Sequence, residues 1–273
     1  MQITESASLH DKLENMTVEE ILTNINHEDA KVHKAVRLEI PKIIEFVERL
    51  YPRVKAGGRL FYIGAGTSGR LGILDASEIP PTFGMPENVV IGLIAGGDVA
   101  IRKAVESAED SYESAWNDMM KFGINAKDTV LGIAASGGTP YVIGGLRSAR
   151  ENGLLTGAIS CNPGSKVAEE AEVIIEPIVG PEFLTGSTRM KAGTAQKMIL
   201  NMISTSLMIK LGRVKGNRMV DMQLTNKKLI KRGTKMIMEE LGLDKDQAQR
   251  LLLLHGSVRA VLQNHQSDMG NSQ

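Results

Sequence analysis

Small hydroxyl-bearing residues and glycines gather in three short stretches of the chain. They read YIGAGTSGR, ASGGTP and ISCNPGS, at residues 62–70, 135–140 and 159–165. Glycine lets the backbone approach a ligand closely, hydroxyls form neutral hydrogen bonds, and N–H groups at helix starts favour an anion. Helix caps and turns explain any one stretch equally well. Three such stretches at strand ends favour a binding site for a phosphate attached to a polyol.

Two glutamates are predicted beside apolar helix faces, where a carboxyl group could transfer protons. Glu78 follows Leu74 by four residues in a helical pattern expected to end at the two prolines that follow, so its side chain is predicted along the buried face. Glu109 flanks the apolar stripe of a second helical pattern, over residues 98–121. Partly buried carboxylates have raised pKa values and can exchange protons near neutral pH. Ordinary ion pairs with nearby arginines are the alternative for both.

The first stretch also spells G-x-G-x-x-G, the fingerprint of dinucleotide-binding loops. Such a site needs an acidic residue about 20 positions further on, at the end of the second strand, to hold the ribose. Here that strand, VVIGLIAGG, ends in Ala95, Gly96 and Gly97, and Asp98 is expected to cap the next helix. The sequence therefore argues against a nucleotide cofactor, and a sugar phosphate fits better.

The elements that must position these residues read as strands alternating with helices. Five short apolar runs, rich in β-branched residues, are typical of buried parallel strands. The predicted strands are Leu60–Ile63, Val89–Ile94, Thr129–Ala134, Leu155–Ser160 and Val173–Ile178. Helical patterns between most of them predict a doubly wound α/β domain with a five-stranded parallel sheet, as in flavodoxin-like folds. The three polar stretches then lie at the carboxyl ends of strands, where such sheets bind ligands.

We expect three parts along the chain. Residues 1–35 form a polar, irregular arm, residues 36–215 the sheet domain, and residues 216–273 a helical C-terminal appendage. Within the last part, one helix is predicted over residues 217–241 and one more after it. Helices alone cannot form a second sheet domain, so this region could also serve as a subunit interface.

Other polar residues give weaker signals. The stretch TGSTRMKAGTAQK, at residues 185–197, opens a helix with hydroxyls and cations. It suits a phosphate or another subunit, although a solvated helix start explains it equally well. The basic run at residues 227–232 is interpreted as a solvated helix face. The five histidines, His10 among them, lack metal-ligand spacing and are expected at the surface, and Cys161 is predicted to pack rather than to bind.

Composition limits the classes of function. The 273 residues include 32 basic and 32 acidic side chains, so no net charge favours a nucleic-acid partner. A single cysteine excludes a disulfide framework, which suits the cytoplasm. The N-terminus has no apolar signal core, and no apolar run approaches the ~20 residues that span a bilayer. We expect a cytoplasmic protein without a membrane partner.

Several stretches closely resemble the bacterial N-acetylmuramic acid 6-phosphate etherases, which belong to the sugar isomerase (SIS) superfamily. The most specific are DASEIPPT and STRMKAGTAQK, and the resemblance covers about residues 1–240. It implies a SIS fold, a homodimer, and no metal or nucleotide cofactor. It also implies cleavage of the D-lactyl ether of N-acetylmuramic acid 6-phosphate by elimination and hydration. The products are N-acetylglucosamine 6-phosphate and D-lactate, in peptidoglycan recycling and amino sugar catabolism.

The resemblance also assigns residues. The two catalytic glutamates of the family fall on the DASE and AED motifs, here Glu78 and Glu109. We assign Glu78 as the acid toward the lactyl oxygen and Glu109 as the base at carbon 2 or toward water. The phosphate and sugar contacts map to Thr67, Ser68, Ser136, Gly137 and Thr139. One position departs from the family: Gly138 stands where an arginine is usual, so any contact of that arginine is absent.

Two other functions remain open at this stage. A sugar-phosphate-sensing regulator related to glucokinase regulatory proteins would bind ligand without turnover, and it would not require both glutamates. Such regulators need two sheet domains, and the length of this chain argues against them. An aldose–ketose isomerase of the same superfamily would give a ketose and no lactate.

Overall fold

The computed structural model describes residues 2–105 and 107–270, which pack into two compact units. The larger unit comprises Met1–Ala76 and Asn88–Leu207. The smaller unit comprises Ser77–Glu87 and Met208–Gln273. A short segment, residues 77–87, therefore packs with the C-terminal residues although it is far from them in the sequence. The expected domain boundaries at residues 35 and 215 stay a prediction.

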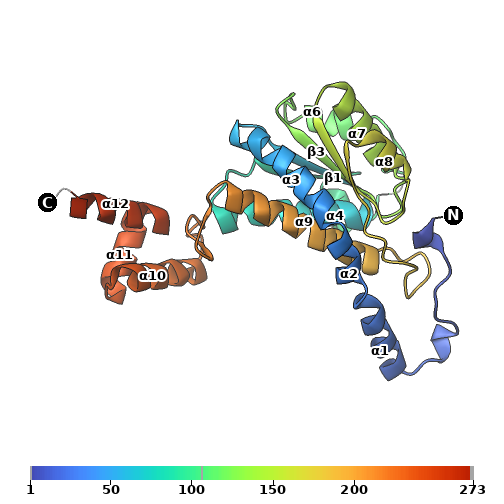
Figure 1. Cartoon of the computed structure of the whole chain (residues 1–273), viewed down its shortest axis with the longest axis horizontal. Helices are drawn as coiled ribbons and strands as arrows, with labels where there is room; N and C mark the ends of the chain where they lie inside the picture. Colours follow the sequence, from blue (N-terminus) through green and yellow to red (C-terminus); the bar gives the residue numbers. More distant parts are fainter. Residues whose placement is uncertain (1, 106, 271–273) are drawn as a thin grey trace. The chain divides into compact units, whose positions relative to one another are not determined.

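Five parallel strands form the sheet of the larger unit, in the order β2-β1-β3-β4-β5 (Figure 1). The strands are β1 Leu60–Gly64, β2 Val90–Ile94, β3 Thr129–Ile133, β4 Leu155–Ile159 and β5 Val173–Ile175. Leu60 pairs with Val90 on one side and with Thr129 on the other, so β2 and β3 flank β1. The predicted α/β fold and its five strands are confirmed, and a topological switch point lies between β1 and β3.

Helices cover both faces of this sheet (Figure 1). They are α3 Ile40–Lys55, α4 Gly66–Phe83, α6 Ser114–Met120, α7 Pro140–Glu151, α8 Lys166–Glu170 and α9 Lys191–Lys210. On one face, α6, α7 and α8 bury alternate strand residues such as Phe61, Val130 and Ala158. On the other face lie α3, the first part of α4, and α9, and Phe46 of α3 packs over Gly157 of β4. Both faces are apolar because both are covered.

The N-terminal residues are more regular than the predicted arm. They contain the helices α1 (Val18–Asp29) and α2 (Val32–Leu38). A capping box starts α1: the Thr17 side chain accepts a hydrogen bond from the Glu20 N–H, and the Glu20 carboxylate accepts one from the Thr17 N–H. The expectation of an irregular arm is therefore wrong for these two helices, of which α1 is stabilised by its capping box.

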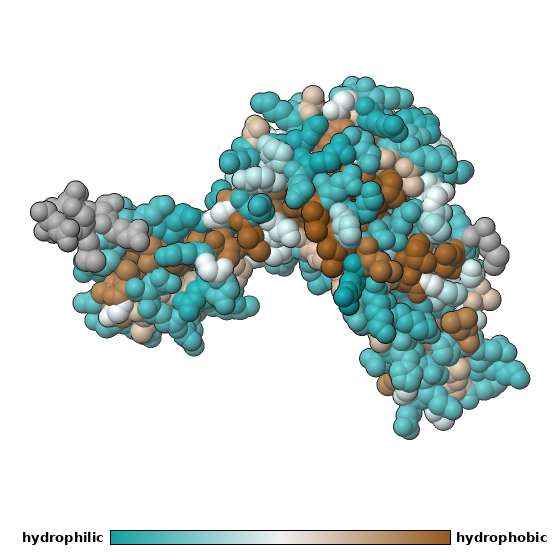
Figure 2. Space-filling model, viewed as in Figure 1, coloured by the Kyte–Doolittle hydropathy of each residue, from teal (hydrophilic) through white to brown (hydrophobic). Residues whose placement is uncertain are grey.

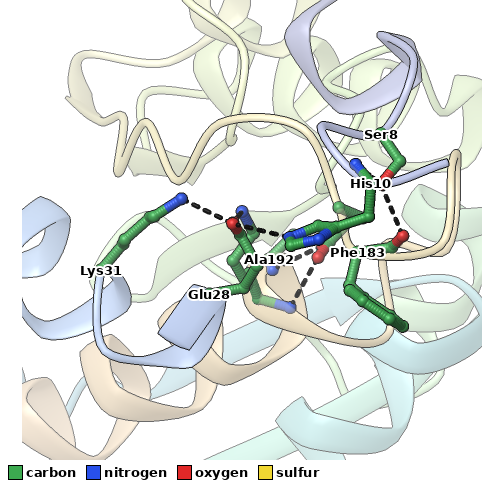
Figure 3. Close-up of polar contacts among 8 residues, drawn as sticks. Ser8, His10, Glu28, Lys31, Phe183 and Ala192 are labelled. Atoms are coloured by element: carbon green, nitrogen blue, oxygen red, sulfur yellow. Dashed lines mark hydrogen bonds and ion pairs between the residues drawn. The ribbon is translucent and has the colours of Figure 1, made fainter. Parts of the chain in front are cut away.

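A buried ion pair fastens α1 to the start of α9 (Figure 3). Lys191 Nζ lies 2.5 Å from Glu28 Oε2, and the two side chains expose only 2% and 6% of their area. Lys31 Nζ and His10 Nε2 approach the same carboxylate, at 2.6 and 3.4 Å. Glu182 accepts two backbone N–H groups at the start of α9 and so caps this helix from a preceding loop.

Two predictions fail at this cluster. Lys191 begins α9, but its side chain is buried rather than solvated. Its charge is neutralised by Glu28, so it is not available to bind a phosphate or another subunit. His10 is half-buried, with 20% of its side chain exposed: besides Glu28, its ring packs against Phe183 with centroids 5.0 Å apart. Both side chains are held by partners far away in the sequence, which local spacing cannot reveal.

The smaller unit is mainly helical. It contains the hairpin β6 (Val214–Lys215) and β7 (Arg218–Met219), followed by the helices α10 (Lys227–Leu241), α11 (Lys245–His255) and α12 (Val258–Gly270). Its apolar core is formed by residues of all three helices together with the segment before α10, among them Val220, Met222, Ile237, Leu252 and Val261. Arg259 binds the Asp221 carboxylate through two nitrogens, at 2.7 and 2.8 Å.

The helix predicted over residues 217–241 is therefore wrong in its first ten positions. A hairpin strand and a loop occupy them, and α10 begins only after Asn226, whose side chain accepts the Leu229 N–H at 3.0 Å. The single helix expected after residue 241 is two helices, separated at Gly256, which adopts the left-handed conformation that ends α11.

The carboxyl group of Glu28, which joins α1 to α9, makes the stability of the fold depend on pH. Burial raises the pKa of Glu28, but hydrogen bonds from Lys191 and Lys31 outweigh burial and lower the pKa from 4.5 to about 2. The folded carboxylate thus binds its proton more weakly than the unfolded one. Its contribution to stability is complete above pH 4.5 and is lost as the pH falls toward 2.

We predict that Glu28→Gln lowers the free energy of unfolding by about 3–5 kcal/mol near neutral pH, because Lys191 then stays buried without its counter-ion. The wild-type protein should lose about 3 kcal/mol as the pH falls through this range, and the variant should lack that loss. Urea unfolding at several pH values measures both. Glu19→Gln, at an exposed position of α1, is the control. Equal unfolding free energies for the two variants would contradict the role of the ion pair.

Candidate active site

The three polar stretches lie side by side at one edge of the sheet. They follow β1, β3 and β4, which are neighbours in the sheet. Because the strands are parallel, all three connections leave from the same edge, next to the switch point between β1 and β3. The predicted juxtaposition is therefore confirmed, and the ligand contacts themselves stay a prediction.

The first connection is a tight turn from β1 into α4. A Cβ at Gly69 would lie 2.8 Å from the Gly64 carbonyl oxygen and 2.5 Å from the side chain of Ile94, so only glycine fits. These glycines let the start of α4 press against the sheet. Thr67 is half-buried, and Ser68 is buried with its Oγ donating to Gln196 Oε1 of α9 at 2.9 Å. Ser68 can therefore offer a ligand its oxygen as an acceptor.

Gln196 is a site residue that sequence reasoning missed. Its side chain is fully buried, and its Nε2 has no hydrogen-bond partner among the described residues. A buried amide without a partner is destabilising, so this nitrogen suits a ligand or water beside Ser68. The signal in the sequence is the place of Gln196 within TGSTRMKAGTAQK, the polar stretch at the start of a predicted helix.

The second and third connections pack directly against each other. Gly137 has φ +72°, and a Cβ there would lie 2.2 Å from the Cβ of Ser165 in the connection after β4. Ser165 Oγ is buried and has no hydrogen-bond partner among the described residues. Thr139 precedes α7 without capping it, so its hydroxyl is not used by the helix. Ser136 Oγ accepts the N–H of Gly138 at 3.3 Å, which fixes the turn.

The N-terminal residues complete this edge of the sheet. Asn162 is buried and donates to the carbonyl of Ser136 at 3.0 Å and to Thr4 Oγ1 at 2.8 Å. Thr4 in turn donates its N–H to Asn162 Oδ1 at 3.1 Å. Gln2 Nε2 lies 3.5 Å from the Ser136 carbonyl oxygen. The first residues of the chain therefore border the turn that carries the predicted ligand contacts.

Glu109 does not lie on a helix, as the sequence predicted. The expected helix over 98–121 is only α5 (Val99–Arg102) and α6, and the described residues between them, 103–105 and 107–113, are irregular. The Glu109 carbonyl accepts the Tyr141 N–H in the first turn of α7, at 2.9 Å. This tertiary bond overrides helix formation and brings Glu109 next to the Thr139 end of α7. The side chain is exposed, so the predicted partial burial is wrong.

Glu78 lies in α4 within the smaller unit. Its side chain is exposed, and Leu74, expected on a buried face with it, is 52% exposed. The helix does not end at Pro80 but continues to Phe83, since proline tolerates helical φ and Gly84 donates its N–H to the Pro80 carbonyl. The predicted burial and helix end are both wrong. Neither Glu78 nor Glu109 makes an ion pair with a described residue, so the ion-pair alternative is not observed.

The aspartate of the same DASE motif is structural. Asp75 is buried, and its carboxylate accepts hydrogen bonds from Tyr62 Oη at 3.1 Å, Asn201 Nδ2 at 2.6 Å and Ser204 Oγ at 3.1 Å. Burial raises the pKa of Asp75, opposed by these hydrogen bonds. The network joins β1, α4 and α9. Asp75 of the motif thus stabilises the packing of these elements, whereas Glu78 makes no ion pair with a described residue.

Cys161 and the residues of metal-ligating types are the remaining candidates. Cys161 is fully buried, and burial raises the pKa of its thiol to about 12, which confirms packing rather than reactivity. Within residues 2–105 and 107–270, no three His, Cys, Asp or Glu side chains cluster as metal ligands would. In the same part of the chain, no helix has the length and apolar character needed to cross a membrane.

Comparison with known proteins confirms the fold. The glucokinase regulatory protein N-terminal SIS domain matches residues 42–150, and the SIS domain matches residues 101–206. Phosphoheptose isomerases from Neisseria gonorrhoeae and Francisella tularensis are similar at 16% and 17% identity, each with a TM-score of 0.52. The match covers 70% and 73% of this chain and 98% and 100% of theirs. Identities this low show the fold alone.

Similarity to curated proteins is much higher. N-acetylmuramic acid 6-phosphate etherases from Bacteroides thetaiotaomicron, Christiangramia forsetii and Porphyromonas gingivalis are 64%, 61% and 64% identical to this chain. The alignments cover 96%, 97% and 94% of this chain and 95%, 97% and 94% of the relatives. They therefore extend over most of both units.

We predict different outcomes for alanine at two adjacent glycines of the β3–α7 turn. Gly137→Ala should lower the free energy of unfolding by about 1–3 kcal/mol, because φ is positive and Ser165 fills the space. Gly138→Ala should change it little, since the nearest atom to a Cβ there is 3.7 Å away. Urea unfolding of both variants measures this. Equal losses in the two variants would show that the turn is not held as described.

Proposed function

Because the chain belongs to the N-acetylmuramic acid 6-phosphate etherase family, we propose that it cleaves the D-lactyl ether of that sugar phosphate. The products are N-acetylglucosamine 6-phosphate and D-lactate, and the enzyme is a carbon–oxygen lyase of peptidoglycan recycling. The observation that carries the proposal is identity of 61–64% along nearly the whole chain. A single buried cysteine fits the cytoplasmic location that we propose with it.

The edge of the sheet binds the sugar phosphate in this proposal. The ligand contacts are Thr67, Ser68, Ser136, Gly137 and Thr139. The proposal is supported by the uncapped start of α7 and by the buried, unpartnered Ser165 Oγ and Gln196 Nε2 at the same edge. Backbone N–H groups at helix starts and hydroxyls suit a phosphate on a polyol. No nucleotide or metal takes part in this reaction.

The reaction needs one base and one acid. Glu109 removes the proton at carbon 2, which the open-chain aldehyde makes acidic, and Glu78 protonates the departing lactyl oxygen. Water then adds to the unsaturated sugar, its oxygen at carbon 3 and a proton at carbon 2. Both carboxylates are exposed and unpaired in the described chain, which supports roles toward a ligand.

We also propose that the enzyme is a homodimer. Leu38, Ile40 and Ile44, around the junction of α2 and α3, expose 78%, 36% and 50% of their area. Figure 2 shows hydrophobic residues gathered in a band on the visible face of the larger unit. Apolar surface of this kind supports association with a second copy.

We predict that the purified protein releases D-lactate from N-acetylmuramic acid 6-phosphate without added metal. Glu78→Gln and Glu109→Gln should each lose at least about 100-fold in kcat while still binding the substrate, because each removes one proton transfer. A coupled lactate dehydrogenase assay and calorimetric binding measure both. Absence of D-lactate in the wild type would remove the etherase proposal, and a ketose product would identify an isomerase instead.

Isotopic water separates the two catalytic roles. In D₂¹⁸O the product should carry deuterium at carbon 2 and ¹⁸O at carbon 3, as elimination followed by hydration requires. Glu109→Gln should slow exchange of the carbon 2 hydrogen. Glu78→Gln should slow release of lactate more than this exchange. The reverse pattern would exchange the two assignments.

We predict a mass in solution of twice the 29.6 kDa of the chain. Ile44→Asp should shift the protein toward the monomer, because it places a charge among the exposed apolar side chains of Leu38 and Ile40. Light scattering coupled to size-exclusion chromatography measures the mass. Ile44→Val, which keeps this surface apolar, is the matched control and should stay dimeric. A monomeric wild type would refute the dimer.

A further inference from the structure

One buried side chain connects the turn after β3, which carries three predicted ligand contacts, to a residue far away in the sequence. Asn162, in the connection after β4, is 3% exposed, and Thr4 is 1% exposed. The Asn162 Nδ2 donates to the Ser136 carbonyl at 3.0 Å and to Thr4 Oγ1 at 2.8 Å. Its Oδ1 accepts the Thr4 N–H at 3.1 Å. Both ends of this amide are therefore bonded to Thr4, and its nitrogen also holds the turn.

The consecutive carbonyl groups of residues 134–137 in this turn all accept hydrogen bonds. Three of them accept from backbone N–H groups at 2.9–3.1 Å: Ala134 from Gly137, Ala135 from Cys161, and Gly137 from Val167. The carbonyl of Ser136 accepts from side chains instead, Asn162 Nδ2 at 3.0 Å and Gln2 Nε2 at 3.5 Å. The Ser136 carbonyl is therefore the one in this turn whose partner a change of side chain elsewhere can remove.

The direction of this carbonyl matters for binding a phosphate. N–H and O–H groups bind phosphate oxygens, whereas a carbonyl oxygen turned toward a phosphate repels it. The Ser136 carbonyl shares a planar peptide group with the Gly137 N–H. Because Asn162 holds the oxygen of this peptide and the Ala134 carbonyl holds its N–H, the peptide is fixed at both ends. The conformation of the turn therefore depends on the orientation of the Asn162 amide.

Thr4 holds the amide in the orientation that this contact requires. It binds the nitrogen through its hydroxyl oxygen and the amide oxygen through its N–H. A reversed amide would place its nitrogen against the Thr4 N–H and its oxygen against the Ser136 carbonyl. Without the hydroxyl, one hydrogen of the nitrogen loses its acceptor, and the Ala135 carbonyl, 3.5 Å away, competes for this nitrogen. The contact with Ser136 is then weakened.

The segment around Thr4 is itself held by the larger unit. Ser8 Oγ donates to the Phe183 carbonyl at 2.7 Å, and the Ser8 N–H donates to Thr185 Oγ1 at 2.9 Å. Figure 3 shows Ser8 and His10 beside Phe183, against which the His10 ring packs. Bonds on both sides therefore determine the position of Thr4.

We infer that Thr4 and Asn162 are positioning residues, which hold the turn at residues 136–139 in the conformation that binds the sugar phosphate. This inference rests on the proposed function, because the ligand contacts of the turn belong to that proposal. The phosphate takes no part in bond breaking, so its contacts are equal in the bound substrate and in the transition state. Weakening these contacts should therefore raise KM and leave kcat unchanged.

Substitution of Thr4 tests this inference. Thr4→Val keeps the shape of the side chain and the backbone N–H but removes the hydroxyl. It should raise KM for release of D-lactate by about 5- to 10-fold with kcat unchanged, because one hydrogen bond of the Asn162 amide is lost. Thr4→Ser restores the hydroxyl and should return KM to the wild-type value. A wild-type KM in Thr4→Val, or an equally raised KM in Thr4→Ser, would overturn the inference.

Thr156 provides a matched control for general loss of stability. It is fully buried in β4, near the end of the strand opposite the ligand edge, and its Oγ1 accepts the Glu172 N–H at 3.1 Å. Thr156→Val thus also loses a buried hydrogen bond, but it should keep the wild-type KM. Urea unfolding compares the stabilities of the two valine variants. An equal rise of KM in both would attribute the effect to destabilisation and overturn the inference.

Direct binding separates this inference from the proposed function. N-acetylglucosamine 6-phosphate carries the phosphate but no lactyl group, and calorimetry measures its Kd without turnover. Thr4→Val should raise this Kd by the same factor as KM, and an unchanged Kd would overturn the inference. If the wild type binds this sugar phosphate but releases no D-lactate, the etherase proposal fails, and the Kd values of the variants still decide the inference. A wild type that binds no sugar phosphate would refute both.

Discussion

Parallel pairing of β1 with β3 and of β3 with β4 is the constraint on which the site depends. It sends three connections out of one edge of the sheet, and their small residues then have to pack against each other. Gly137 shows how tightly they pack, because the Ser165 side chain occupies the space that any larger residue would need. The glycines at this edge thus allow close packing of the turns. The polar side chains around them include hydrogen-bonding groups that have no partner among the described residues.

Buried carboxylates hold the helices that frame this edge. Asp75 joins β1, α4 and α9, and Glu28 joins α1 to α9 through Lys191. These carboxylates differ in what neutralises them: Asp75 has only neutral donors in direct contact, so burial raises its pKa, whereas Glu28 meets two lysines and its pKa falls. The charged residues expected to do chemistry, Glu78 and Glu109, are exposed instead. Support and reactivity are therefore assigned to different carboxylates, even within the DASE motif.

Sequence periodicity predicted the elements that bury continuous apolar surface. All five strands were found, because each is covered on both faces and reads as a β-branched run. The predictions that failed depend on partners distant in sequence. The segment around Glu109 is irregular because its carbonyl bonds to Tyr141, and Lys191 is buried because Glu28 reaches it from α1. The reaction was predicted from long motifs that resemble a family, which neither composition nor periodicity could supply.

The larger unit contains the part of the fold that solved isomerase structures share with this chain. Phosphoheptose isomerases match about seven-tenths of this chain with nearly all of theirs, so the shared fold does not include everything that the chain contains. An isomerase moves protons within one sugar, whereas an etherase must also release a second, negatively charged fragment. The smaller unit contributes Glu78, which lines a cavity together with Lys228 and Arg232. A common sheet can therefore support different reactions, because the fold alone does not fix the chemistry and the residues added to it do.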